Sequence, residues 1–124
     1  MRRITIAVLA LGMAACTNSS TTGPSGSLSG TYRLQTINGS PVPYTFASGV
    51  TLQSDVLTLS SNGNYSDAAQ YSDGRLIVEQ GYYNNYNGAI TFTDQSNNNN
   101  YQGSISGTVL TEIVSGLTEV YQKQ

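Results

Sequence analysis

The chain has 124 residues with 5 Lys or Arg, 7 Asp or Glu, no histidine and one cysteine, which fits one small acidic domain. Nucleic-acid binding needs clustered cations, so this composition argues against it, and the lack of histidine removes the usual general base. Nine tyrosines among many Asn, Ser, Thr and Gly residues favour extended strands and polar turns over helices. We therefore predict an all-β protein that is not an enzyme and uses no cofactor or metal.

The N-terminus has the pattern of a bacterial export signal. Arg2 and Arg3 precede an apolar run at residues 4–15, which is too short to span a bilayer. We predict that residues 1–15 form a signal peptide that is cut off. The mature side chains then carry three cations against seven carboxylates, a net charge of −4.

Ala14-Ala15-Cys16 resembles the lipobox of bacterial lipoproteins, in which the bond before the cysteine is cut and the cysteine is lipidated. The resemblance implies that Cys16 carries diacylglyceryl and acyl groups such as palmitate. The protein would then be a membrane-anchored lipoprotein of the bacterial cell envelope, in the outer membrane and facing the periplasm. The alternative is an ordinary cysteine in a soluble secreted protein. With a single cysteine, no internal disulfide is expected.

Residues 16–29 have the Ser, Thr and Gly composition of a flexible linker, and a single domain is predicted at 30–124. Alternating apolar residues and Gly-containing turns such as Asn62-Gly63 and Asn87-Gly88 divide this domain into about nine short strands. Gly81 indicates a bulge or a sharp bend. The strands are predicted at 31–37, 45–53, 56–60, 64–72, 75–80, 89–93, 101–106, 109–114 and 117–123.

An antiparallel series of short strands without a covering helix buries its apolar face best by closing on itself. We predict a closed up-and-down β-barrel of eight or nine strands, with a two-sheet β-sandwich as the alternative. Closure would pair the first strand with the last. It would bring the Lys123 ammonium close to the Tyr32 ring.

Several short motifs make the domain similar to the lipocalin-like domains of small bacterial lipoproteins. These motifs are Gly30-Thr31-Tyr32, Asn62–Tyr65, Gly81–Phe92 and Val120–Lys123. The resemblance implies a lipocalin-like barrel in which Tyr32 takes the place of a tryptophan that closes one barrel end beneath a basic side chain, here Lys123. Many such domains bind small apolar molecules, others fill their interior, and lipoproteins of related architecture include inhibitors of proteases and lysozymes.

The predicted interior residues carry no charge, so we expect a monomer that binds a small, weakly polar ligand. They are Tyr32, Leu34, Leu57, Leu59, Tyr83, Ile90 and Phe92. The alternative is a protein-interaction module that recognises an envelope protein, such as a secreted protease or lysozyme, through its loops. A free interior volume of several hundred cubic ångströms would favour the small ligand.

The sequence allows two orientations for Glu112, and it also allows either Tyr82 or Tyr83 to face inward. Val109, Thr111 and Ile113 are expected to face inward, which leaves Glu112 in solvent; the other alternation would bury Glu112 and give it a raised pKa. Tyr82 and Tyr83 cannot both face inward, and the Gly81 next to them leaves the choice undecided. The polar run at 94–100 lacks the spaced carboxylates of a calcium loop and is expected to be a turn.

Overall fold

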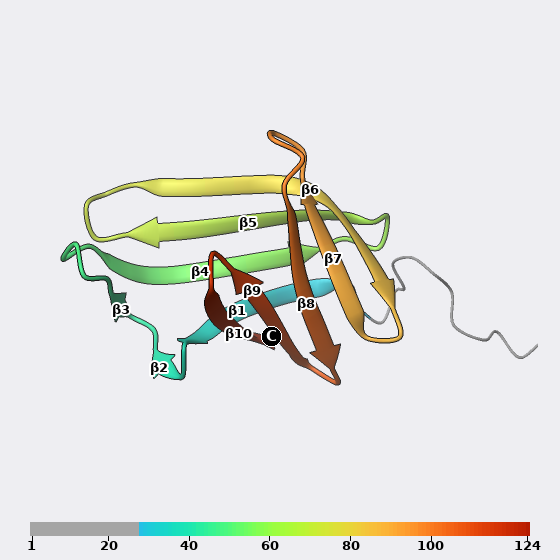
Figure 1. The fold of residues 1–124 in the computed structure, drawn as a ribbon, viewed down its shortest axis with the longest axis horizontal. Helices are drawn as coiled ribbons and strands as arrows, with labels where there is room; N and C mark the ends of the chain where they lie inside the picture. Colours follow the sequence, from blue (N-terminus) through green and yellow to red (C-terminus); the bar gives the residue numbers. More distant parts are fainter. Residues whose placement is uncertain (1–27) are drawn as a thin grey trace, which may run out of the picture.

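The structure is a computed structural model that describes residues 28–124 (Figure 1). The predicted signal peptide, Cys16 and the linker as far as residue 27 lie outside the described residues. No helix that could cross a membrane is found in the part of the chain that the structure describes.

Residues 28–124 form ten β-strands, and no helix occurs among them. The strands are β1 (Gly30–Ile37), β2 (Ser40–Pro41), β3 (Tyr44–Thr45), β4 (Thr51–Leu59), β5 (Asn64–Tyr71), β6 (Leu76–Tyr86), β7 (Ala89–Asp94), β8 (Asn100–Ser106), β9 (Val109–Val114) and β10 (Leu117–Lys123).

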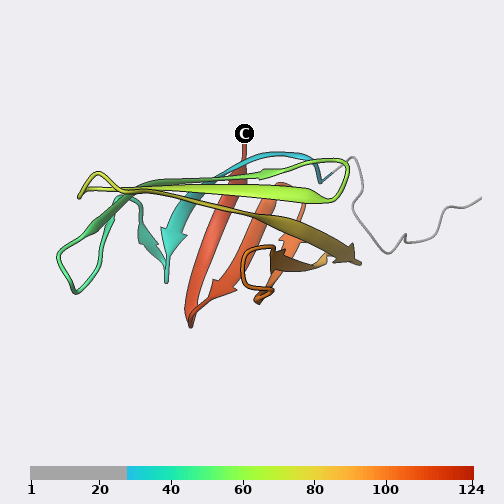
Figure 2. The same cartoon turned by 90° about the horizontal axis from the view of Figure 1, so that it is seen from above.

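Eight of these strands close into an antiparallel barrel. Strands β4 to β10 pair in chain order, and β1 closes the circle between β10 and β4. The two-residue strands β2 and β3 add short pairings to β1 and β4. The long strands β4 to β6 run lengthwise and the strands of the other wall cross them steeply (Figures 1 and 2). The prediction of an all-β closed up-and-down barrel is therefore confirmed, and the alternative sandwich is not formed.

The first and last strands meet as closure requires. Tyr32 pairs with Lys123 across β1 and β10, and the Lys123 Nζ lies 5.9 Å from the centre of the Tyr32 ring. The Tyr32 hydroxyl donates a hydrogen bond of 2.8 Å to the carbonyl oxygen of Leu28, which is itself buried. Leu28, which lies inside the range predicted as linker, thus contacts the folded domain.

One predicted pair of strands is wrong. The ranges 45–53 and 56–60 were expected as two strands, but β4 runs unbroken through Asp55, with a register shift between Leu52 and Ser54. Residues 46–50 form a turn instead, in which the Gly49 N–H donates to the carbonyl of Phe46. Asp55, which falls between the two predicted ranges, is accommodated inside β4 because the strand face that it shares with Leu57 has a polar environment in the barrel.

Gly81 allows two strands to approach closely without a bulge. The register of β6 with β5 continues through it without a shift, and the pairing of β6 with β7 begins at it, so of the predicted bulge or sharp bend the bulge is not formed. A Cβ at this position would collide with the carbonyl oxygen of Thr93 and would lie 2.9 Å from the Tyr65 ring. The missing side chain is therefore a requirement of packing between β6 and its neighbours.

We expect Gly81→Ala to destabilise the domain by about 1–3 kcal/mol, the usual cost of overpacking. Asn84→Ala, an exposed position on the same strand, is the matched control and should change stability by less than about 0.5 kcal/mol. Urea unfolding followed by tyrosine fluorescence measures both. Equal midpoints for the two variants would show that the close approach to Thr93 imposes no constraint.

Candidate functional site: an acidic cavity in the barrel

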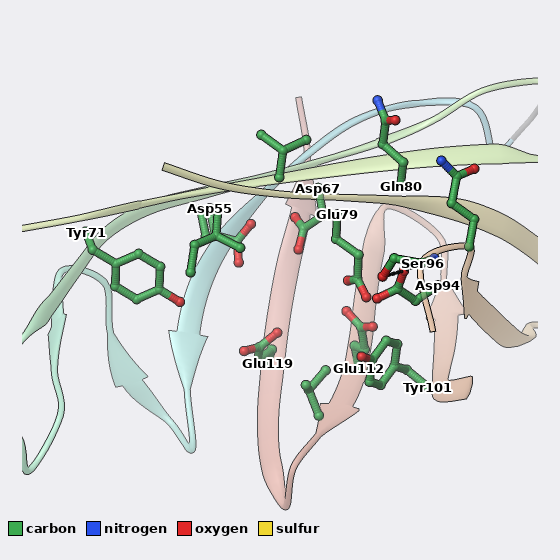
Figure 3. Close-up of a pocket in the computed structure, with 15 residues that line it drawn as sticks. Asp55, Asp67, Tyr71, Glu79, Gln80, Asp94, Ser96, Tyr101, Glu112 and Glu119 are labelled. Carbon is green, nitrogen blue, oxygen red and sulfur yellow. Dashed lines mark hydrogen bonds between the residues drawn. The ribbon is translucent and has the colours of Figure 1, made fainter. Parts of the chain in front are cut away.

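Six carboxyl groups face the interior of the barrel, one from each of six strands. They are Asp55 of β4, Asp67 of β5, Glu79 of β6, Asp94 of β7, Glu112 of β9 and Glu119 of β10. Together they line a cavity of about 690 Å³ (Figure 3). The seventh carboxylate of the described residues, Asp73, lies instead in the exposed turn between β5 and β6, where Arg75 Nε donates to it at 2.6 Å.

The strand alternation explains why these groups converge. Asp55 lies two residues from Leu57, Asp94 two from Phe92, and Glu112 two from Leu110, so each carboxylate shares a strand face with a core residue. Figure 3 shows Asp67 and Glu79 on one wall of the cavity and Glu112 and Glu119 on the opposite wall. One part of the interior is thus packed with apolar side chains and another is lined with carboxyl groups.

The seven residues predicted to face inward are all buried and belong to the packed core. Phe92, for example, meets the Tyr65 ring edge to face with centroids 5.2 Å apart. None of the seven lines the acidic cavity. The structure also settles the open choice between Tyr83, which is buried, and Tyr82, which is exposed.

The expectation that no charge faces inward is wrong, and so is the favoured facing of Glu112. Glu112 is only 7% exposed, whereas Ile113 is 56% exposed and Val109 also faces solvent. The reason is the register, because Leu110 opposes the buried Tyr121 and thereby directs its own face of β9 into the barrel. The inward facing of Asp55 and Asp94 was predictable from the sequence, since each lies two positions from a residue that was predicted to face inward.

Asp55 and Asp67 form a buried carboxyl pair. Burial raises the pKa of Asp67 well above its usual range, and the hydrogen bond and charge of Asp55 raise it further. Burial also raises the pKa of Asp55, against hydrogen bonds from Asp67 and Tyr121 that lower it. The Oδ1 atoms of both side chains are buried and have no hydrogen-bond partner within residues 28–124. The pair therefore shares a proton, with Asp67 as the protonated member.

Glu79 and Asp94 form a second pair with a clearer division of roles. The Ser96 hydroxyl and N–H donate to Asp94 Oδ1 at 2.7 and 2.8 Å and hold the pKa of Asp94 below its usual value. Burial and the hydrogen bond to Asp94 raise the pKa of Glu79 to about 7. Asp94 is thus the ionised member of this pair, and Glu79 retains a proton up to neutral pH.

Glu112 and Glu119 face each other directly across β9 and β10. Burial, followed by the charge of Glu119, raises the pKa of Glu112 to about 8. Burial and the charge of Asp55 raise the pKa of Glu119 to about 7. The Tyr121 hydroxyl lies 3.1 Å from Glu119 Oε2 and 3.3 Å from Asp55 Oδ2, so its single hydrogen serves one of two acceptors at a time.

The remaining cavity wall is partly apolar and partly aromatic. Ala69, Ile77 and Val114 contribute apolar surface, and Tyr71 and Tyr101 contribute rings. The rim reaches solvent, because the lining residues Ile77, Gln95 and Ser96 are exposed. The cavity is therefore open to solvent at this rim.

Comparison with protein-family models, with curated proteins and with solved structures finds no match for this chain. The fold and the site accordingly define the class: a small closed antiparallel β-barrel with an acidic, solvent-accessible cavity inside it.

Proposed function

We propose that this protein is a lipid-anchored envelope protein whose barrel binds a small ligand in the acidic cavity. The observation that carries the proposal is the cavity itself, whose volume of about 690 Å³ falls within the range of small-molecule sites. Ligand binding is enough to account for such a cavity, so we propose a binding protein and not an enzyme. The ligand would place apolar groups against Ala69, Ile77 and Val114 and polar groups against the carboxyls.

Ala69→Phe tests this function, because Ala69 is buried and lines the cavity. Ala68→Phe is the matched control, since the neighbouring position on β5 faces the other side of the sheet. Native mass spectrometry of protein isolated from envelopes without detergent should find the same small molecule on the parent and on Ala68→Phe, and none on Ala69→Phe. An equal ligand content in all three proteins would contradict the proposal.

The proposed anchor makes a separate prediction. Cys16→Ser should abolish labelling by radioactive palmitate and leave the protein either soluble or with an uncut signal, because the lipid is attached at that sulfur. The circular dichroism spectrum should not change, since β1 begins only at Gly30. A Cys16→Ser protein that still sediments with membranes and has a mature N-terminus would rule out the lipobox assignment.

A second candidate function is recognition of another protein, such as a secreted protease or lysozyme. It is favoured by the exposed apolar run Leu76, Ile77 and Val78 at the start of β6, which follows the turn between β5 and β6 at one end of the barrel (Figure 1). The double variant L76D/V78D should then lose any inhibition of such an enzyme that the parent exerts. Ala69→Phe should retain that inhibition.

A further inference from the structure

The cavity concentrates negative groups without a protein cation to balance them. Six carboxyl groups line it, and none of its lining residues within 28–124 is a lysine or arginine. Arg75 lies 5.0 Å from the centre of the Tyr71 ring but belongs to the outer turn with Asp73. Buried like charges are costly, so this arrangement needs either retained protons or a cation from outside.

Asp55 and Asp67 each have a buried oxygen atom that lacks a hydrogen-bond donor in the described part of the chain. Asp55 is only 5% exposed, and its Oδ1 and that of Asp67 are buried without a hydrogen-bond partner within residues 28–124. Buried acceptors without donors cost free energy, and a charged donor is the strongest partner that they can gain. A ligand N–H carried by a cation would supply this donor and also replace the shared proton.

The shape and wall of the cavity favour an organic cation. About 690 Å³ holds a molecule of many atoms, and Tyr71 and Tyr101 can contact a cation through their ring faces. Ala69, Ile77 and Val114 can cover an apolar body. Among residues 28–124, no three Asp, Glu, Cys or His side chains are placed as ligands of a single metal ion.

We infer that the cavity binds a small organic cation, an ammonium or amidinium with an apolar body, which displaces a proton held between Asp55 and Asp67. The inference rests on the proposed function and names the ligand class. The displaced proton leaves for solvent, so one positive charge enters the site as another departs. The pH dependence therefore reports on all the titratable groups that face the pair. These are Tyr71 of β5, Glu79 of β6, Asp94 of β7, Tyr101 of β8, Glu112 of β9, and Glu119 and Tyr121 of β10.

Calorimetry with three probes of similar shape tests this inference: 2-phenylethylamine, the neutral 2-phenylethanol and the anion 3-phenylpropionate. We expect the amine to bind about tenfold or more tightly than the alcohol, and the anion not to bind. Titration in phosphate and in Tris, which differ in ionisation enthalpy, should show net proton release with the amine. Its affinity should rise between pH 6 and pH 8, where the cavity loses protons and the amine stays protonated.

Substitutions of single carboxyl residues test whether the cavity carboxyls are responsible for amine binding. Asp67→Asn and Glu112→Gln keep the side-chain shape and should each weaken amine binding about tenfold or more, while leaving the alcohol unaffected. Asp73→Asn removes the carboxylate outside the cavity and should bind like the parent. Measuring two cavity variants keeps the test decisive if one of them fails to fold.

The outcomes separate this inference from the proposed function. Equal binding of amine and alcohol would overturn the cation and leave a ligand-binding barrel. Saturable Ca²⁺ binding without amine binding would replace the organic cation by a metal. Absence of binding by all three probes would also overturn the inference, and the proposed function would then stand or fall with the small molecule on the parent that Ala69→Phe lacks.

Discussion

Raising the pH from about 5 to about 9 should destabilise the folded domain by several kcal/mol. Burial raises the pKa of Glu112 to about 8 and those of Glu79 and Glu119 to about 7, while an unfolded chain returns each to about 4.3. Between these values the folded state binds more protons than the unfolded state, so stability falls as the pH rises. The contribution is complete below about pH 4 and is lost as the pH passes through 7 and 8.

Thermal unfolding at a series of pH values measures this effect, and Glu112→Gln provides its sharpest variant. Glutamine has nearly the same shape but cannot ionise, so the variant should be more stable than the parent at pH 9 and nearly equal to it at pH 5. Asp73→Asn should leave the slope unchanged, because hydrogen bonds from Arg75 lower the pKa of Asp73, which does not face the cavity. A parent whose stability increases from pH 5 to pH 8 would refute the buried, proton-retaining cluster.

Phe92→Ala should cost about 3–5 kcal/mol, the usual loss for a large aromatic residue truncated in a packed core. Phe92 is 1% exposed and packs against the rings of Tyr65 and Tyr83, at centroid distances of 5.2 and 6.4 Å. Tyr86→Ala, on the adjoining strand, is the control, because Tyr86 is 58% exposed and should lose less than about 0.5 kcal/mol. Urea unfolding measures both variants.

The same variant separates the core from the binding site. Phe92 does not line the acidic cavity, so Phe92→Ala should bind the amine probe like the parent under conditions where it remains folded. A variant that keeps its fold but loses the amine would place the ligand among the core residues. The prediction of an apolar interior site would then be restored.

Much of the fold was predictable because strands and turns are local features. Alternation in Thr31–Ile37 and in Ala89–Thr93, together with turns such as Asn87-Gly88, predicted strands that the structure contains. Closure followed from the need of an antiparallel series to pair its outer edges. The prediction failed at two residues. Asp55 was expected between two strands but lies inside β4, and Gly81 was expected at a bulge or a sharp bend but pairs with β5 without a bulge.

The acidic cavity was not predicted, although two of its six carboxylates lie two positions from residues that were predicted to face inward. Asp55 and Asp94 share a face with Leu57 and Phe92, so the alternation that predicted the core also places these carboxylates inside. Neither was predicted to face inward, because Asp55 fell between two predicted strands and Asp94 began a predicted polar turn; an isolated buried charge would also be expensive. Inside the barrel they are not isolated, since shared protons and neighbouring donors such as Ser96 lower that cost.

By itself, the sequence determined an all-β chain with alternating strands, tight glycine turns and two ends able to pair. Only the tertiary structure decided which face of β9 points inward, because Leu110 and Val109 are both apolar and the alternation fits either choice. Pairing of Leu110 with Tyr121 resolved it and brought Glu112 opposite Glu119. The physical reason is that periodicity specifies the faces of one strand, whereas carboxylates from six strands meet only when the barrel closes.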